Sequence, residues 1–181
     1  EISVIKERET EPVSIPDTDG LITNVPGVLL TTVHADCLPV WFYDPEHNAI
    51  GLVHAGWRGT AAGIAAKAVR KMGTHYGSRP EAMQCVIGPG ISACCFEVGP
   101  EVYVAFKEIW DFTDTFSRPE GEKYFLDIKG INRQQLLEEG VKAENVKVSA
   151  HCTCCEPEQF CSYRREGGTY RRMGAGLCLL P

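Results

Sequence analysis

The sequence has few of the features that would place it with membrane, secreted or nucleic-acid-binding proteins. It contains no run of about 18 apolar residues, so it offers no candidate membrane span. No basic stretch precedes a short apolar one, so no signal peptide is recognised. The formal charge of −6 argues against a general binder of nucleic acids or anionic membranes. Internal repeats are lacking as well, and 181 residues with 44% hydrophobic content predict a single domain over residues 1–181.

Cysteine is abundant, yet its pattern does not suggest a disulfide framework. The chain has nine cysteines, an odd number, and Cys94-Cys95 and Cys154-Cys155 are adjacent pairs that suit such a framework poorly. We therefore expect free or metal-bound thiols in a reducing cytoplasm. The chain begins with Glu1 rather than Met, which we interpret as a domain without its N-terminal segment.

Short apolar runs rich in β-branched and aromatic residues predict strands, and helical spacing of apolar residues predicts helices. The predicted strands cover residues 2–5, 21–23, 28–33, 38–43, 49–53, 85–87 and 146–149. The predicted helices cover residues 60–76, 99–110 and 128–140, and residues 111–123 are predicted to be a loop. Because strands and helices are interspersed, we expect an α/β or α+β domain with mixed sheet layers flanked by helices.

Residues 31–60 are the most informative stretch, because two predicted strands there carry possible metal ligands at adjacent ends. A polar turn separates strands 38–43 and 49–53, which predicts an antiparallel hairpin. Cys37 precedes the first strand and His54 follows the second, so both lie at the open end of the hairpin. A thiolate and an imidazole placed in this way suit Zn²⁺, or alternatively Cu. Taken singly, each residue is more often a buried structural one.

Polar residues beside these ligands suggest proton transfer and anion binding. Asp36 adds a carboxylate that could exchange a proton near the metal. Arg58, Gly59 and Thr60 lead into the predicted helix 60–76, whose free N–H groups and dipole would hold a phosphate together with the arginine.

A second group of thiols has two interpretations. It consists of Cys152, Cys154 and Cys155, with Cys161 nearby. A metal site is one interpretation, but the Cys152-x-Cys154 gap is tighter than the two to four residues usual in structural zinc sites. We therefore favour a thiol-rich strand end, and we expect Cys94-Cys95 to be structural or to line a pocket.

Several motifs together resemble the YfiH-type family, also called laccase-domain or multicopper polyphenol oxidase-like proteins. The motifs are Ala35-Asp36-Cys37-Leu38-Pro39-Val40, His54-Ala55-Gly56-Trp57-Arg58-Gly59, Cys95-Phe96-Glu97-Val98-Gly99 and Ser162-Tyr163-Arg164-Arg165. The resemblance implies a single α/β domain with layered sheets and outer helices. It also implies a metal site made from Cys37, His54 and a further His in an upstream motif that this sequence does not contain. His34 stands where the family usually has Thr, either as an extra polar group or as a replacement ligand.

The same resemblance implies a zinc-dependent enzyme that acts on small molecules, with phosphorolysis of purine nucleosides and deamination of adenosine. Zinc would activate water. Phosphate would be held by Arg58, Gly59 and Thr60. Arg164, which belongs to a family motif, would contribute to substrate binding. Trp57 would pack in the core or stack on the base.

Three other functions remain open at this point. A copper polyphenol oxidase would need a type 1 site and a histidine-rich trinuclear cluster, whereas the chain has five histidines. A hydrolase of cell-wall precursors would use Cys37 as nucleophile and His54 as base, with no metal. A non-catalytic binding module would leave the convergence of Cys, His, Asp and Arg unexplained.

Overall fold

A mixed sheet of six strands forms the centre of the computed structural model, which describes residues 1–9, 11–168 and 171–180. In spatial order its strands are β1 (Ile2–Ile5), β2 (Gly20–Thr23), β5 (Ala49–Ala55), β4 (Leu38–Asp44), β6 (Gln84–Ile87) and β10 (Val146–Val148). The outer pairs β1–β2 and β6–β10 are parallel, and the pairs between them are antiparallel. β6 and β10 therefore end at the same edge of the sheet.

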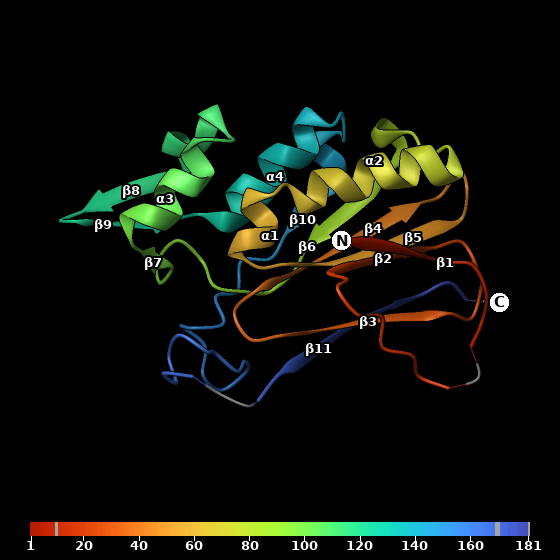
Figure 1. Cartoon of the computed structure of the whole chain (residues 1–181), viewed down its shortest axis with the longest axis horizontal. Coiled ribbons are helices and arrows are strands. Elements are labelled where there is room, and N and C mark those ends of the chain that lie inside the picture. The colour runs from red at the N-terminus through yellow and green to blue at the C-terminus, as the bar shows by residue number, and fades with distance from the viewer. Residues whose placement is uncertain (10, 169–170, 181) are drawn as a thin grey trace.

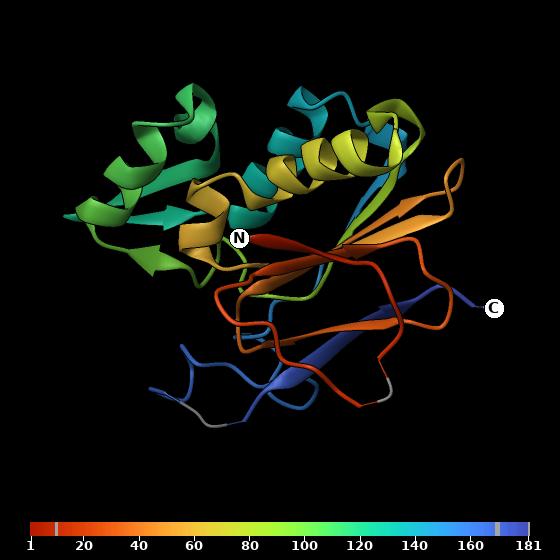
Figure 2. The same cartoon turned by 45° about the vertical axis from the view of Figure 1, so that its right-hand side comes forward.

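Helices cover one face of this sheet and a two-stranded ribbon covers the other (Figures 1 and 2). The helical layer contains α1 (Trp57–Ala61), α2 (Ile64–Tyr76) and α4 (Ile128–Glu138). The ribbon pairs β3 (Leu29–His34) with β11 (Met173–Cys178) in antiparallel register. Because both faces of the sheet are covered, nearly every residue of β5 is buried, although antiparallel strands more often alternate between buried and exposed residues.

A third, smaller sheet projects from one end of the molecule, as Figure 1 shows. It consists of β7 (Glu97–Val98), β9 (Lys123–Leu126) and β8 (Ser117–Glu120), and α3 (Pro100–Lys107) packs beside it. The chain also contains three short 3₁₀ helices among the described residues, η1 (Pro80–Ala82), η2 (Asp111–Phe116) and η3 (Ala143–Asn145).

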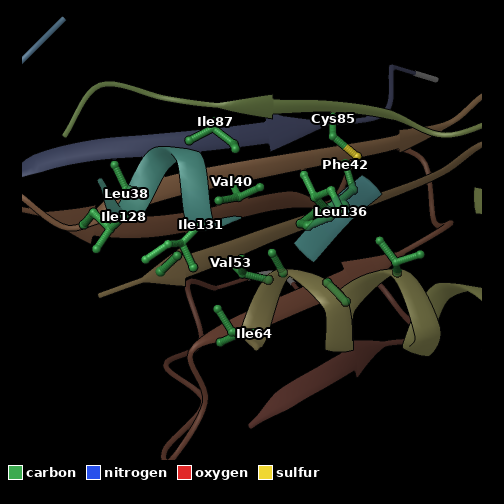
Figure 3. Close-up of a cluster of buried hydrophobic side chains, with 14 of the residues drawn as sticks. Leu38, Val40, Phe42, Val53, Ile64, Cys85, Ile87, Ile128, Ile131 and Leu136 are labelled. Atoms are coloured by element: carbon green, nitrogen blue, oxygen red, sulfur yellow. The ribbon is translucent and has the colours of Figure 1, made fainter. Parts of the chain in front are cut away.

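The main core lies between the central sheet and its helices. Leu38, Val40 and Phe42 point inward from alternate positions of β4 and meet apolar side chains of α2 and α4, including Ile64 and Ile131 (Figure 3). A second, smaller core fills the space between the sheet and the β3–β11 ribbon, and contains Leu30, Ile50, Leu52, Ala175 and Leu179.

The predicted α+β architecture is confirmed, but two local predictions are wrong. The helix predicted over residues 60–76 is two helices, because Gly63 adopts the left-handed conformation with φ 71°. A side chain at Gly63 would meet the ring of Trp110, so glycine is required there for packing as well as for conformation. The loop predicted over residues 111–123 instead forms η2, β8 and the start of β9. No helix among the described residues has the length and apolar character needed to cross a membrane.

Candidate functional site

The hairpin of β4 and β5 brings Cys37 and His54 to the same place. His54 pairs with Pro39 across the hairpin, and Cys37 directly precedes β4. Both donor atoms approach Gly56, where an added Cβ would lie 3.1 Å from the Cys37 Sγ and 3.7 Å from the His54 Nε2. The absence of a side chain at Gly56 therefore leaves open the space onto which the thiol and the imidazole converge.

These two side chains fit the first part of a metal site in chemistry as well as in position. Burial lowers the pKa of His54, which keeps its imidazole neutral and able to coordinate. Burial, followed by the neighbouring Asp36 carboxylate, raises the pKa of the Cys37 thiol, while Arg172 opposes this effect. A thiol in this state is a poor nucleophile unless a metal deprotonates it. The donor set of one sulfur and one nitrogen suits zinc or copper.

His34 lies beside His54 at the end of β3. The two ring centroids are 4.8 Å apart, and the His34 Nε2 is 2.7 Å from the Thr32 Oγ1. Its Nδ1 is buried and has no hydrogen-bond partner among the described residues. Burial, followed by the neighbouring His54, lowers the pKa of His34 to about 4. Within the described part of the chain, no group of three mutually close ligand atoms contains both Cys37 and His54, so His34 does not complete the set in this arrangement.

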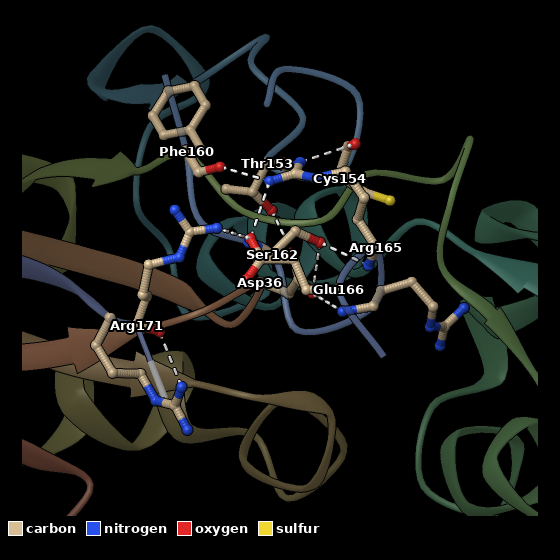
Figure 4. Close-up of polar contacts among 10 residues, drawn as sticks. Asp36, Thr153, Cys154, Phe160, Ser162, Arg165, Glu166 and Arg171 are labelled. Atoms are coloured by element: carbon tan, nitrogen blue, oxygen red, sulfur yellow. Dashed lines mark hydrogen bonds and ion pairs between the residues drawn. The ribbon is translucent and has the colours of Figure 1, made fainter. Parts of the chain in front are cut away.

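Asp36 is buried and its carboxylate is fully engaged with neighbouring loops (Figure 4). Its Oδ1 accepts a hydrogen bond of 2.6 Å from the Thr153 hydroxyl. Its Oδ2 accepts from the Ser162 hydroxyl at 3.0 Å and from the Arg164 backbone N–H at 2.7 Å. The Asp36 carbonyl also accepts from the Ile91 N–H at 2.8 Å. Such a carboxylate holds loops in place, and this geometry favours a positioning role over the proton transfer predicted from the sequence.

The left-handed backbone of Asp36, with φ 79°, bends the chain just before Cys37. In a regular strand, residues three apart, such as His34 and Cys37, would face opposite sides. Because of the bend, this segment is not a regular strand, and His34, Cys37 and His54 all lie in one region of the molecule.

A cavity of about 440 Å³ opens beside Cys37 and His54. Aromatic side chains and arginines form much of its wall, namely Trp57, Phe96, Tyr163, Arg164 and Arg172. The Arg164 guanidinium donates to the carbonyls of Cys95 and Glu97 at 2.9 Å and 2.8 Å, which fixes it at the rim. The cavity thus combines metal-type donors, flat apolar surfaces and positive charge.

Arg58, Gly59 and Thr60 do not join this cavity. The Arg58 guanidinium lies 4.2 Å from the centre of the Trp57 ring, and Arg58 and Gly59 line a different cavity of about 750 Å³ beside α2. Thr60 is buried, and its hydroxyl accepts a hydrogen bond of 2.9 Å from the Asn132 side chain. Its N–H donates to the Gly56 carbonyl at 2.8 Å. The helix begins at Trp57 rather than at Thr60, so the predicted anion site with a free Thr60 N–H does not form.

Sequence reasoning missed part of the cavity wall. Phe96, Tyr163 and Arg172 had no assigned role, although Phe96 and Tyr163 lie inside motifs that were recognised. Their position within those motifs was the available signal. Cys94 and Cys95 also approach Cys152 and Cys155 closely, a contact that spacing along the chain does not reveal.

The fold and this cavity define a class of protein. Proteins of this class have an α+β domain with a layered mixed sheet. Their pocket places a Cys–His donor pair beside walls of aromatic side chains and arginines. The chain belongs to the multi-copper polyphenol oxidoreductase laccase family, whose sequence profile matches residues 1–180. The resemblance to YfiH-type proteins is thereby confirmed.

Relatives of the chain are named as purine nucleoside phosphorylases and as an adenosine deaminase. The chain is 40% identical over 162 residues to the purine nucleoside phosphorylase YlmD of Geobacillus stearothermophilus, in a match that covers 88% of the chain and 59% of the relative. It is 34% identical over 184 residues to adenosine deaminase RL5 from an unknown prokaryotic organism, covering 97% and 70%. The crystal structure of the same YlmD superposes with a TM-score of 0.86 at 39% identity, covering 90% of this chain and 61% of that one. The chain therefore spans about three fifths of the length of YlmD.

Proposed function

We propose that this chain forms the substrate pocket of a zinc-dependent purine nucleoside enzyme, which carries out phosphorolysis of nucleosides and deamination of adenosine. The observation that carries the proposal is the convergence of the Cys37 Sγ and the His54 Nε2 on Gly56, beside a cavity walled by aromatic side chains. The names of relatives at 34% to 40% identity support the same substrate class.

Cys37 and His54 are the residues that would hold the zinc ion. When bound, zinc supplies Lewis-acid activation and lowers the pKa of water to about 7. The neutral imidazole of His54 is ready to bind it, whereas Cys37 must lose its proton on binding.

The cavity wall is suited to a flat base and an anion. Trp57, Phe96 and Tyr163 present rings on which a purine can stack, since such stacking is tolerant of the particular base. Arg172 lines the cavity and its charge acts on Cys37, so we assign it the phosphate-binding role. Arg164 contributes charge at the rim.

Arg58 and Asp36 act through their neighbours in this proposal. Arg58 stacks on Trp57 and would fix the orientation of that ring. Asp36 ties the loops that carry Thr153, Ser162 and Arg164 to the residue before Cys37. Both are positioning residues, which replaces the direct phosphate and proton-transfer roles predicted from the sequence.

The test uses the complete protein that contains this chain. It is incubated with adenosine and phosphate, with and without chelator, and adenine, inosine and hypoxanthine are followed by chromatography. Turnover that chelation abolishes and zinc restores supports the proposal. No turnover in a folded, zinc-loaded sample overturns it. Hydrolysis of cell-wall precursors that a chelator does not affect would instead favour Cys37 as a metal-free nucleophile, although its raised pKa argues against that chemistry.

A further inference from the structure

Four cysteines from two distant parts of the chain meet at one edge of the central sheet. Cys94 and Cys95 lie in a turn that follows β6, and Cys152 and Cys155 lie in a turn that follows β10. Because β6 and β10 are parallel neighbours, their ends bring the two turns together. An isolated parallel bridge between Gly90 and Cys152 continues this pairing beyond the strands.

The four sulfur atoms lie within 4.8 Å of one another. Cys94 lies 3.6 Å from Cys152 and 3.5 Å from Cys155, and Cys95 lies 3.3 Å from Cys155, measured between sulfur atoms. Sulfur atoms at the corners of a tetrahedron around zinc, with Zn–S distances of about 2.3 Å, are about 3.8 Å apart. The three separations given are slightly shorter than this value and the others lie within 4.8 Å, so the four sulfur atoms can surround one ion after small movements.

We propose that Cys94, Cys95, Cys152 and Cys155 form a structural zinc site, separate from the Cys37–His54 pocket. Cys152 and Cys155 have the Cys-x₂-Cys spacing common in structural zinc sites. Sulfur would fill all four coordination positions of the ion and leave none open for water, as in structural zinc sites. The thiol protons pass to solvent when the ion binds.

This assignment corrects the ligand set considered from the sequence. That set joined Cys152 and Cys155 to Cys154 and Cys161, whereas the folded chain replaces the last two with Cys94 and Cys95. A cluster with several iron atoms needs more widely spaced thiolates, because its ligands surround the whole cluster rather than one ion. A single tetrahedral ion is therefore the better fit.

A backbone N–H group and a buried ammonium group lie close to Cys152. The Ser92 N–H donates to the Cys152 Sγ at 3.4 Å. Lys129 is buried nearby, and its charge interacts with both Cys152 and Cys94. Four thiolates around Zn²⁺ would carry a net charge of −2, which this ammonium group would offset in part.

A metal at these sulfurs would fasten the wall of the pocket. Thr153, between two of the ligands, donates to Asp36, and the Cys95 carbonyl accepts from Arg164. Phe96, next to Cys95, lines the cavity. The site would thus join the two turns that hold these groups, although it contributes no ligand to the pocket itself.

The first experiment measures zinc content in the complete protein carrying Cys37→Ala, which removes the pocket ligand. The protein is purified without oxygen, loaded with zinc and freed of loosely bound ions. Adding Cys94→Ser and Cys155→Ser should remove about one zinc ion per chain, the content of one four-coordinate site. Adding Cys161→Ser instead is the matched control, because this half-buried thiol lies outside the cluster, and it should leave the zinc content unchanged. Equal zinc content in all three proteins overturns the proposal.

The second measurement does not depend on the serine variants folding. X-ray absorption at the zinc edge of the Cys37→Ala protein should show four sulfur neighbours at about 2.3 Å. A first shell dominated by nitrogen or oxygen, or iron in place of zinc, would contradict the assignment. A Cys95–Cys155 disulfide found by mass spectrometry in the oxygen-free preparation would also contradict it.

Discussion

The Asp36 carboxylate and the Thr153 hydroxyl are joined by a buried hydrogen bond of 2.6 Å. It links the residue before Cys37 to the turn between two of the clustered cysteines, so the pocket and the thiol cluster share one support. We expect Asp36→Asn to lower the free energy of unfolding by about 2 kcal/mol or more, because its amide nitrogen would face donors that now meet a carboxylate. Thermal and denaturant unfolding measure this loss.

Thr153→Val is the milder companion variant, since it removes one hydrogen bond and should cost about 1 kcal/mol. If Asp36→Asn retains full stability while turnover disappears, Asp36 is a proton-transfer residue and the positioning role is wrong.

Tyr163 offers the safest test of base stacking, because its side chain is 57% exposed and the core does not depend on it. Tyr163→Ala should raise the KM for adenosine about tenfold, since stacking on an aromatic ring contributes about 1–3 kcal/mol per base. Tyr163→Phe keeps the ring and should behave like the natural protein in steady-state kinetics. An unchanged KM in the alanine variant would remove Tyr163 from the proposed binding surface.

Arg172 and Arg58 should differ in their effects on phosphate binding. Arg172→Ala should raise the KM for phosphate by about tenfold or more, because hydrogen bonds to a charged group contribute about 1.5–3 kcal/mol. Deamination of adenosine needs no phosphate and should change less. Arg58→Ala should alter both reactions modestly and together, since Arg58 acts through the Trp57 ring. A selective loss of phosphate binding in Arg58→Ala would return the phosphate role to that residue.

Acid should weaken the turn of the central hairpin through Asp44. Burial raises the pKa of this carboxyl, but Ser78, His47 and the Glu46 N–H outweigh it and bring the pKa below its usual range. The His47 Nδ1 lies 2.7 Å from the Asp44 Oδ2. Because the folded-state pKa is the lower one, the stabilisation is complete above the unfolded-state value and is lost as pH falls through the folded-state value.

Urea unfolding between pH 7 and pH 3 measures this effect. The natural protein should lose stability at the acid end, and Asp44→Asn should start less stable and show a flatter dependence on pH. Parallel curves for the two proteins would mean that Asp44 contributes nothing to the acid sensitivity.

Local signals were sufficient for the hairpin and for the meeting of Cys37 with His54. The two predicted strands flank a short polar turn, and the observed strands of 7 residues each pair directly around that turn, so local sequence is enough to indicate the hairpin. The break at Gly63 could not be read in this way, because its reason is the ring of Trp110, which comes from a later part of the chain. The phosphate-binding role predicted for Arg58 assumed a helix that begins at Thr60. The helix begins three residues earlier, and Arg58 lines the cavity beside α2 instead.

The thiol cluster shows the same limit more clearly. Nearness in the sequence grouped Cys152 with Cys154, Cys155 and Cys161, and the tight gap between Cys152 and Cys154 led us to favour a structural role over a metal site. The partners in the fold are set by the parallel pairing of β6 with β10, which depends on the whole sheet. Periodicity therefore predicts elements, whereas the groups that meet at strand ends depend on the order of strands.

The β4–β5 hairpin also bears on the order in which the molecule assembles. Its strands are close in sequence, so the loop that joins them closes at little entropic cost and this unit can form early. The contacts of Asp36 with Thr153, Ser162 and Arg164 span 117 to 128 residues, so they can form only once most of the chain is in place. We expect the pocket to be among the last parts to become structured during synthesis, which makes its assembly a sensitive reporter of complete folding.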